Sequence, residues 1–209
     1  MPIFSEKALT RRLLPLRGAT MRLFLASSSP RRSDILSQFG IPFEVIPNCL
    51  EDECLETAVS LRMAVRRLAL EKAVRSVGDF SGLILGVDTI VVCDGHVIGK
   101  PRDRMHVRDI IGGLQGRSHQ VITAFGLVDT VHNRNLSRSD IATVTIRSMT
   151  GPAMDRYSRE APVLDKAGAY GVQDETFPIV EKVIGSRYTV MGLPIVQLLG
   201  ILKNYSIDG

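Results

Sequence analysis

Aromatic residues are scarce in this chain of 209 residues: they make up 5% of it, and tryptophan is absent. Proteins that bind single-stranded nucleic acid stack the bases on aromatic side chains that alternate with basic ones. The net charge is only +4, and the most basic stretches, residues 11–22 and 62–72, are short and interrupted. We therefore expect no nucleic-acid partner, and a cleft that binds a polyphosphate accounts for charge of this sign.

Cysteine and long apolar runs are also in short supply. Three cysteines, Cys49, Cys54 and Cys93, provide no framework of disulfides, and this is typical of proteins in a reducing cytoplasm. No apolar run approaches the roughly 18 residues of a membrane-spanning helix. The apolar pieces within residues 1–20 are too short for the core of a signal peptide. The sequence therefore predicts a cytoplasmic protein that does not associate with a membrane.

Short apolar strands alternate with helical patterns along the chain, and this alternation predicts an α/β architecture. A chain of this length can form one large core or two small lobes that share a cleft. We expect residues 1–20 to be a peripheral extension and residues 21–209 to form a single domain. The expected strands cover residues 22–26, 43–46, 83–92, 119–128, 137–147 and 179–183, and the expected helices cover residues 30–39, 57 or 60 to 77, 104–114, 153–160 and 194–203.

Residues 25–32, L-A-S-S-S-P-R-R, join the first predicted strand to the first predicted helix. Pro30 suits the first helical position, and Ser29 suits the N-cap. Arginines in a first helical turn are unusual, because the helix dipole favours negative charge there. Free N–H groups, serine hydroxyls and the guanidinium groups of Arg31 and Arg32 can together bind a phosphate. An ordinary Ser-Pro helix start with solvated arginines is the alternative.

Two charged residues occur in apolar patterns: Asp88 within the strand of residues 83–92, and Lys72 at the end of an apolar helical stripe. A carboxylate in such a strand is costly unless it is paired, binds a metal ion or faces a cleft. We therefore interpret Asp88 as functional, although a bend at Gly86 that lets Asp88 cap a turn is an alternative. Lys72 either extends its ammonium to water or points it at a bound phosphate.

Two loops add further candidates. Residues 165–173, D-K-A-G-A-Y-G-V-Q, contain two glycines and two alanines, which allow either close approach to a ligand or a tight turn. Gln173 offers a donor and an acceptor that can read the edge of a base. Lys100 lies in the stiff loop Gly99-Lys100-Pro101, which is not a P-loop, since neither G-x-x-x-x-G-K nor G-x-G-x-x-G occurs.

Together these residues suit polyphosphate chemistry. Arginines at a helix start, two lysines, Asp88 and the acidic residues 51–53 can hold a triphosphate, a divalent cation and an attacking water. Mg²⁺ prefers carboxylate oxygens combined with the phosphate oxygens of a substrate. No serine or cysteine nucleophile with an adjacent base is evident, so a covalent mechanism is the weaker hypothesis.

From about residue 21 to residue 203 the sequence resembles the Maf family of nucleoside triphosphate pyrophosphatases. Seven segments carry the resemblance in the family's order: L-A-S-S-S-P-R-R (25–32), L-A-L-E-K-A (68–73), G-V-D-T-I-V-V (86–92), G-K-P-R-D (99–103), H-Q-V-I-T-A (119–124), D-K-A-G-A-Y-G-V-Q (165–173) and M-G-L-P (191–194). The resemblance implies a mixed, elongated sheet with flanking helices in two lobes around a cleft, as in inosine triphosphate pyrophosphatases. It also implies a homodimer that uses Mg²⁺ or Mn²⁺ to cleave a nucleoside triphosphate to the monophosphate and pyrophosphate.

The family's catalytic roles fall on four residues here. Asp88 would orient or deprotonate the attacking water, or hold the metal ion. Lys72 and Lys100 would neutralise phosphate charge, and Arg32 would contact phosphate or position the nucleotide. Asp52 would be the second metal ligand, where the family has a glutamate. The shorter side chain of Asp52 would shift a bound metal ion by about the length of one methylene group. Glu51 or Glu53 is the alternative metal ligand.

Substrate binding would fall on Ser27, Arg31 and Gln173. The P-R-R and A-Y-G-V-Q segments resemble those of members that act on dTTP and UTP. Members that act on 7-methyl-GTP carry a bulky residue after the motif proline. We therefore expect hydrolysis of dTTP and UTP, with modified pyrimidine nucleotides as further candidates. The alternatives are a 7-methyl-GTP pyrophosphatase and a regulator of septum formation that acts through protein interaction.

Overall fold

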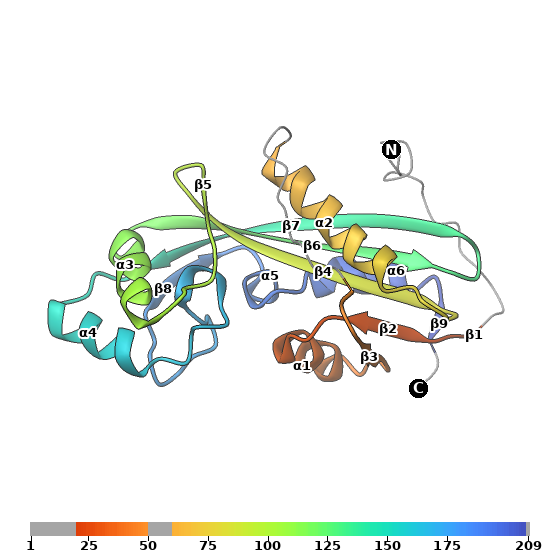
Figure 1. The fold of residues 1–209 in the computed structure, drawn as a ribbon, viewed down its shortest axis with the longest axis horizontal. Coiled ribbons are helices and arrows are strands. Elements are labelled where there is room, and N and C mark those ends of the chain that lie inside the picture. The colour runs from red at the N-terminus through yellow and green to blue at the C-terminus, as the bar shows by residue number, and fades with distance from the viewer. Residues whose placement is uncertain (1–19, 50–59, 208–209) are drawn as a thin grey trace. The chain divides into compact units, whose positions relative to one another are not determined.

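The structure is a computed structural model that describes residues 20–49 and 60–207. Its strands form a seven-stranded sheet in the order β3-β2-β4-β6-β7-β8, with β5 paired to β4, and a separate pair β1-β9 (Figure 1). The strands are β1 (Thr20–Met21), β2 (Leu23–Ala26), β3 (Glu44–Ile46), β4 (Leu83–Cys93), β5 (His96–Ile98), β6 (Ser118–Asp129), β7 (Arg134–Ile146), β8 (Val180–Ile184) and β9 (Ser206–Ile207). The sheet is mixed, because β2 runs parallel to β3 and β4 while β5 and β8 run antiparallel to their neighbours.

Helices flank this sheet, so the predicted mixed α/β class is confirmed. They are α1 (Pro30–Gln38), α2 (Leu61–Arg75), α3 (Arg104–Leu114), α4 (Gly151–Glu160), α5 (Arg187–Met191), α6 (Ile195–Leu202) and the 3-10 turn η2 (Ala167–Ala169). Of the two predicted starts for the second helix, the structure has the later one, where the Ser60 side chain accepts a hydrogen bond from the Met63 N–H. Within the described ranges, no helix combines the length and the apolar character needed to cross a membrane.

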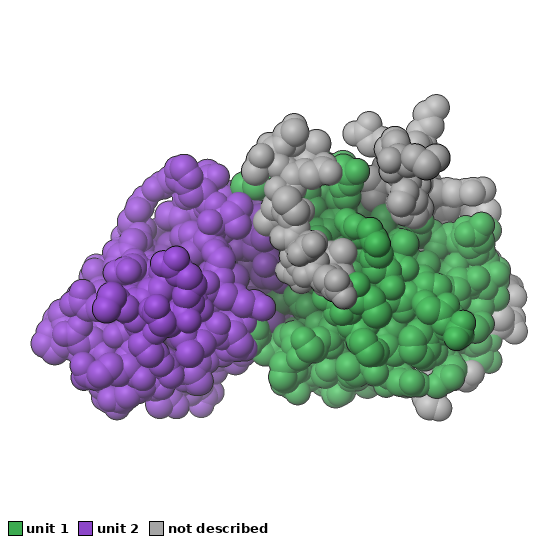
Figure 2. All heavy atoms as spheres, viewed as in Figure 1, with its two compact units in different colours: residues 1–88, 123–140, 192–209 green, residues 89–122, 141–191 purple. Residues whose placement is uncertain are grey.

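The chain divides into two compact units (Figure 2). Unit 1 consists of residues 1–88, 123–140 and 192–209, and unit 2 consists of residues 89–122 and 141–191. Three long strands, β4, β6 and β7, contribute residues to both units.

In unit 1, α2 packs directly on the sheet because glycines lie beneath it. A Cβ atom added at Gly86 of β4 would lie 2.4 Å from the carbonyl oxygen of Ala69, and one added at Gly126 of β6 would lie 2.3 Å from Leu70 Cα. Real Cβ atoms essentially never lie so close to backbone atoms. The strand β4 continues without a break from Leu83 to Cys93. Gly86 therefore serves helix packing, and the alternative in which the chain bends there is wrong.

The start of α1 differs in one detail from the expected cap. Ser29 occupies the N-cap position and Pro30 the first helical position, but the Ser29 side chain makes no capping hydrogen bond. Instead, the Ser27 hydroxyl accepts a hydrogen bond from the Ser29 N–H at 3.3 Å. The helix ends at Gln38, and Gly40 follows with a φ of +64°, the left-handed conformation expected of a glycine after a helix.

The elements absent from the sequence predictions are the short ones. They are β1, β5, β9, α5 and η2, of two to five residues each, too short to show a period of two or 3.6 residues. Thr20 lies in the predicted peripheral extension, yet it pairs with Ser206 in the parallel pair β1-β9. Residues 1–19 of that extension, together with Asp52, Cys54 and the acidic loop, lie outside the described residues.

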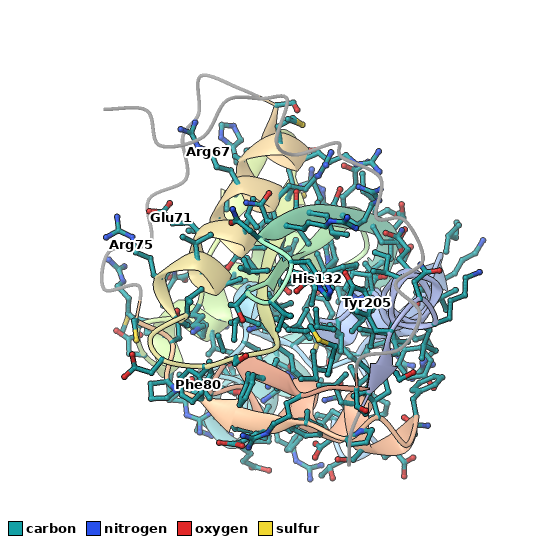
Figure 3. The ribbon with its side chains drawn as sticks, turned by 90° about the vertical axis from the view of Figure 1, so that its right-hand side faces the viewer. Arg67, Glu71, Arg75, Phe80, His132 and Tyr205 are labelled. Atoms are coloured by element: carbon teal, nitrogen blue, oxygen red, sulfur yellow. The ribbon has the colours of Figure 1, made fainter. Side chains whose placement is uncertain are left out.

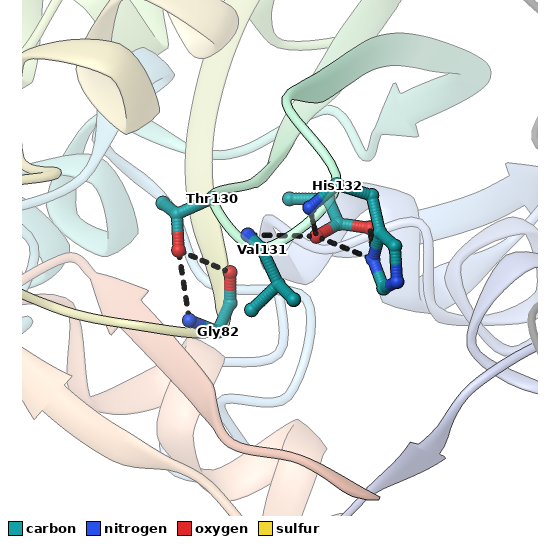
Figure 4. A network of polar contacts seen from close by, with 5 residues as sticks. Gly82, Thr130, Val131 and His132 are labelled. Atoms are coloured by element: carbon teal, nitrogen blue, oxygen red, sulfur yellow. Dashed lines mark hydrogen bonds and ion pairs between the residues drawn. The ribbon is translucent and has the colours of Figure 1, made fainter. Parts of the chain in front are cut away.

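The turn between β6 and β7 is fastened to the start of β4 (Figure 4). The Thr130 hydroxyl accepts a hydrogen bond from the Gly82 N–H at 2.9 Å, and the Thr130 N–H donates to the Gly82 carbonyl at 3.0 Å. The buried Asp129 carboxylate accepts hydrogen bonds from the N–H groups of Val131 and His132 at 3.1 and 2.9 Å. The tight turn therefore rests on side chains that satisfy its backbone donors.

Replacement of Thr130 by valine is expected to lower the free energy of unfolding by about 1–2 kcal/mol, because the Gly82 N–H would lose its acceptor. Urea unfolding measures this loss. The control is Thr143→Val, on the same hairpin, where the hydroxyl bonds none of the described residues and valine favours a strand. Equal unfolding free energies for the two variants would show that the Thr130 contact does not stabilise the turn.

Candidate active site

Arg32 and Ser27 form the first part of the candidate site, at the start of α1. The Arg32 guanidinium donates from Nη1 to the Ser27 hydroxyl at 2.7 Å and from Nε to the Gly192 carbonyl at 3.1 Å. Ser27 is buried, and Arg31 and Arg32 are partly exposed. Two anchors thus fix the Arg32 fork in the first helical turn, where N–H groups of the backbone are available to an anion. For Arg32, the alternative of a solvated side chain is therefore wrong.

Lys72 and Asp88 form the second part. The Lys72 ammonium lies 2.7 Å from Asp88 Oδ1, and the two side chains are only 5% and 9% exposed. Lys72 therefore does not extend to water, and Asp88 does not cap a turn. A buried ion pair costs desolvation energy and is weak evidence for stability alone. Its position in a strand that is otherwise apolar instead favours a functional role.

Each part of the candidate site has one residue on or directly after the two paired strands β2 and β4. The parallel strands β2 and β4 place Ala26 beside Gly86. Ser27 directly follows Ala26, and Asp88 lies two residues beyond Gly86. Both residues therefore lie just past the carboxyl end of the stretch over which β2 pairs with β4. Ligands of open α/β sheets bind outside the carboxyl ends of parallel strands. Unit 1 therefore contains Ser27, Arg31, Arg32, Lys72 and Asp88, five of the eight predicted site residues.

Unit 2 contains Lys100 and Gln173, both exposed, on two loops that contact each other. The Gly168 N–H donates to the Gly99 carbonyl at 3.1 Å. Gly168 has a φ of +73°, and a Cβ atom there would lie 3.0 Å from a methyl group of Val91, so only glycine suits this turn. The glycine-rich segment thus makes a tight turn that holds Lys100 and Gln173 on joined loops. Asp52, the eighth predicted residue, lies outside the described residues.

Two buried side chains support the Gln173 loop from below, and neither was predicted. His119 Nε2 lies 2.7 Å from the Tyr170 hydroxyl, and the Tyr157 hydroxyl donates to the Ala169 carbonyl at 2.9 Å. His119 Nδ1 is buried without a hydrogen-bond partner among the described residues. Burial raises the pKa of Tyr170 far above its usual value and keeps its hydroxyl protonated. His119 lies in a segment of the family resemblance, which was the available signal, whereas Tyr157 lies outside all seven segments.

Acid should weaken the fold through His119. Burial lowers the pKa of His119 to about 4, from an ordinary value near 6.5. Between these values the unfolded chain binds a proton that the folded chain does not, so stability falls as the pH drops. We expect this histidine to account for about 2 kcal/mol of unfolding free energy lost between pH 7.5 and pH 5.

The measurement is urea unfolding of wild type and His119→Gln at both pH values. Glutamine does not titrate in this range and can still bond the Tyr170 hydroxyl. The variant should therefore lose about 2 kcal/mol less than wild type over the same interval. Identical losses in the two proteins would show that His119 titrates alike in the folded and unfolded chains.

The donor set for a divalent cation is partly visible. Asp88 Oδ1 is held by Lys72, whereas Oδ2 accepts no hydrogen bond from the described residues. A single carboxylate oxygen fits Mg²⁺, which binds through one or two carboxylates together with substrate phosphates and water. Over residues 20–49 and 60–207, no three His, Cys, Asp or Glu side chains gather as a ready metal cluster.

Comparisons with known proteins identify relatives over nearly the whole chain. The sequence profile described as Maf-like protein matches residues 22–205. A dTTP/UTP pyrophosphatase of Aquifex aeolicus is 41% identical over 190 residues, which cover 90% of this chain and 97% of that protein. Proteins of the same name are 40% identical in Pectobacterium atrosepticum, over 88% of this chain and 93% of that one, and 34% identical in Clostridioides difficile, over 88% and 95%.

A solved structure of a nucleoside-triphosphatase, a dITP/XTP pyrophosphatase of Mycobacterium abscessus, covers 60% of this chain and 73% of that one. Its sequence identity of 18% and TM-score of 0.39 are too low to add to the sequence matches. The sequence profile spans nearly the whole chain, and the relatives align over almost their full length. The chain therefore belongs to the Maf-like protein family.

Proposed function

We propose that this protein hydrolyses dTTP and UTP to the nucleoside monophosphate and pyrophosphate. The observation that carries the proposal is the buried Lys72–Asp88 pair, which lies just beyond the Ser27 end of the parallel strands β2 and β4. The names of the relatives in Aquifex, Pectobacterium and Clostridioides support the same reaction. A site that pairs fixed cations with one available carboxylate oxygen suits attack by water on a phosphate anhydride.

The proposed reaction is a single displacement at the α-phosphorus. A water oxygen forms a bond to this phosphorus, the bond to the bridging oxygen of the β-phosphate breaks, and pyrophosphate leaves. Asp88 Oδ2 orients the water or takes its proton, or in the alternative role holds a divalent cation, while Lys72 holds Oδ1 and so fixes the direction of the carboxylate. Arg31, Arg32 and Lys100 bind the phosphate oxygens, and their charges stabilise the additional charge of the transition state.

We further propose that the reaction uses Mg²⁺ or Mn²⁺, with Asp88 and Asp52 as protein ligands. The available Oδ2 atom of Asp88 supports this assignment. When bound, such a cation would neutralise phosphate charge and polarise the phosphorus–oxygen bonds. Gln173 is proposed to contact the pyrimidine base, because its exposed amide lies on the turn that Tyr170 and Tyr157 hold in place. The family resemblance also leads us to propose a homodimer in the cytoplasm.

Pyrophosphate release from a panel of nucleoside triphosphates, with and without Mg²⁺ or Mn²⁺, tests this proposal. We expect metal-dependent release from dTTP and UTP in wild type and none above background in Asp88→Ala. A preference for 7-methyl-GTP would keep the reaction and overturn the assigned substrate. No release from any nucleotide would overturn the enzymatic proposal and favour the alternative role in septum formation.

A further inference from the structure

A second basic pocket lies in unit 1. It has a volume of about 560 Å³ and is lined by Arg62, Arg66, Arg138, Ser139, Gln197 and Ile201. The first two arginines lie one turn apart on α2, Arg138 belongs to β7, and Gln197 belongs to α6. None of these residues takes part in the reaction proposed above.

Hydrogen bonds to β7 hold the two arginines of α2 in place. Arg62 donates from Nε to the Ser139 hydroxyl at 2.9 Å and from Nη2 to the Ser139 carbonyl at 3.3 Å. Arg66 makes the matching pair of bonds to the Ser137 hydroxyl and carbonyl, at 3.3 and 3.0 Å. β7 pairs with β8 only from Thr143 onward, so these carbonyls lie on an edge without a neighbouring strand in the described chain. The pocket is thus built and ordered.

Within residues 20–49 and 60–207, no carboxylate forms an ion pair with the three arginines of the pocket. All partners of Arg62, Arg66 and Arg138 among the described residues are neutral serine, carbonyl or thioether groups. Burial and the charges of the other two arginines lower the pKa of Arg66. A guanidinium has five N–H donors, and the bonds to β7 use only some of them.

The outward side of the same helix shows the contrast (Figure 3). There Arg67, Glu71 and Arg75 follow one another, and the Arg75 guanidinium lies 3.4 Å from the Glu71 carboxylate. Arginines that serve only as a solvated face are balanced in this way along a helix. Arg62 and Arg66 gather like charge around a cavity instead, which is the arrangement that recognises phosphate.

Helix geometry separates this pocket from the active site. Lys72 lies six residues beyond Arg66, about 9 Å along the helix axis and about 120° around it. β7 is two strands away from β4, which carries Asp88, and that spacing is about 10 Å. The arginine pocket and the Lys72–Asp88 pair therefore open on different sides of α2.

We propose that the pocket of Arg62, Arg66 and Arg138 is a second anion site that binds a condensed phosphate, as in pyrophosphate or the phosphate tail of a nucleotide. Three guanidinium groups that approach from two helical positions and a strand match several phosphate oxygens at once. The cavity volume of about 560 Å³ also exceeds the space that one orthophosphate fills. Because product and substrate of the proposed reaction both carry this group, the site would sense them without contacting the reacting atoms.

Isothermal titration of the full chain with inorganic pyrophosphate tests the pocket. Wild type should bind at two sites, of which Arg32→Gln weakens one and Arg66→Gln the other. Arg66→Gln and Arg138→Gln should each weaken the second site at least about tenfold, because each removes a charge-assisted contact. The control Arg75→Gln removes the same charge from the same helix and should change the affinity less than twofold. Arg138→Gln is the variant less prone to misfold, since among the described residues Arg138 bonds only the neighbouring Ser137 carbonyl.

The outcomes separate the pocket from the proposed function. Unchanged pyrophosphate affinity in both Arg66→Gln and Arg138→Gln, or an equal loss in Arg75→Gln, would overturn the second site. The protein could bind pyrophosphate through these arginines and yet hydrolyse no nucleotide. That result would support the second anion site and overturn only the enzymatic proposal. Titration with ADP distinguishes the two sources of the phosphate group. If the site binds ADP more tightly than pyrophosphate, its ligand is a nucleotide. If it binds ADP equally or more weakly, its ligand is the free anion.

Discussion

Asp88→Asn is expected to lower kcat for dTTP by about 10³, with little change in KM. Asparagine keeps the shape of the aspartate but cannot take a proton from water, and a positioned base contributes about 10²–10⁴ to a rate. Steady-state release of pyrophosphate at saturating Mg²⁺ measures the effect. Retention of more than a tenth of the wild-type kcat would show that Asp88 does not act in the chemical step.

The same substitution also changes stability, and a second variant separates the two effects. Asp88→Asn leaves the buried Lys72 ammonium without its carboxylate partner, which should cost about 3–5 kcal/mol of unfolding free energy. Lys72→Met combined with Asp88→Asn removes both charges and should recover most of this loss. Activity in the double variant should stay as low as in Asp88→Asn alone. If it returned together with the stability, the pair would have a structural role alone.

Local patterns explain how much of the fold was predictable. The helix predicted over residues 104–114 has these bounds in the structure, because Asp103 caps it and its apolar residues repeat on one face. The strand with Asp88 was identified for a similar reason, since one carboxylate in an apolar run is visible without tertiary information. The predicted functional importance of Asp88 remains a proposal, while its burial and its pairing with Lys72 are observed.

Contacts between distant segments explain what the sequence did not reveal. The Gly192 carbonyl that anchors Arg32 lies 160 residues away along the chain, and a backbone acceptor has no signature of residue type. The pair of His119 and Tyr170 spans 51 residues. The arginine pocket combines α2 and β7, whose residues looked like an interrupted basic stretch and an ordinary strand. Such sites arise from strand order and register, which the periodicity of one segment does not determine.

Gly86→Ala is expected to destabilise the protein by about 3 kcal/mol and to abolish most of its activity. The added Cβ would lie 2.4 Å from the backbone at Ala69 and Ala73, where no flexible side chain can yield, so α2 must move off the sheet. Lys72 belongs to the same helix, one residue before Ala73, and its ammonium would move away from Asp88. Displacements of about 1 Å in catalytic groups reduce rates about 10²-fold. Urea unfolding and pyrophosphate release measure the two effects on one preparation.

Gly200→Ala provides the matched control, because Gly200 lies in α6 of the same unit and an added Cβ there meets no atom within 4 Å. Alanine at this helical position should raise stability by about 0.5–1 kcal/mol and leave kcat unchanged. If Gly86→Ala behaved like this control, α2 would tolerate displacement without loss of the Lys72–Asp88 geometry. If it lost stability but kept kcat, the geometry of the Lys72–Asp88 pair would not depend on the close contact of α2 with β4.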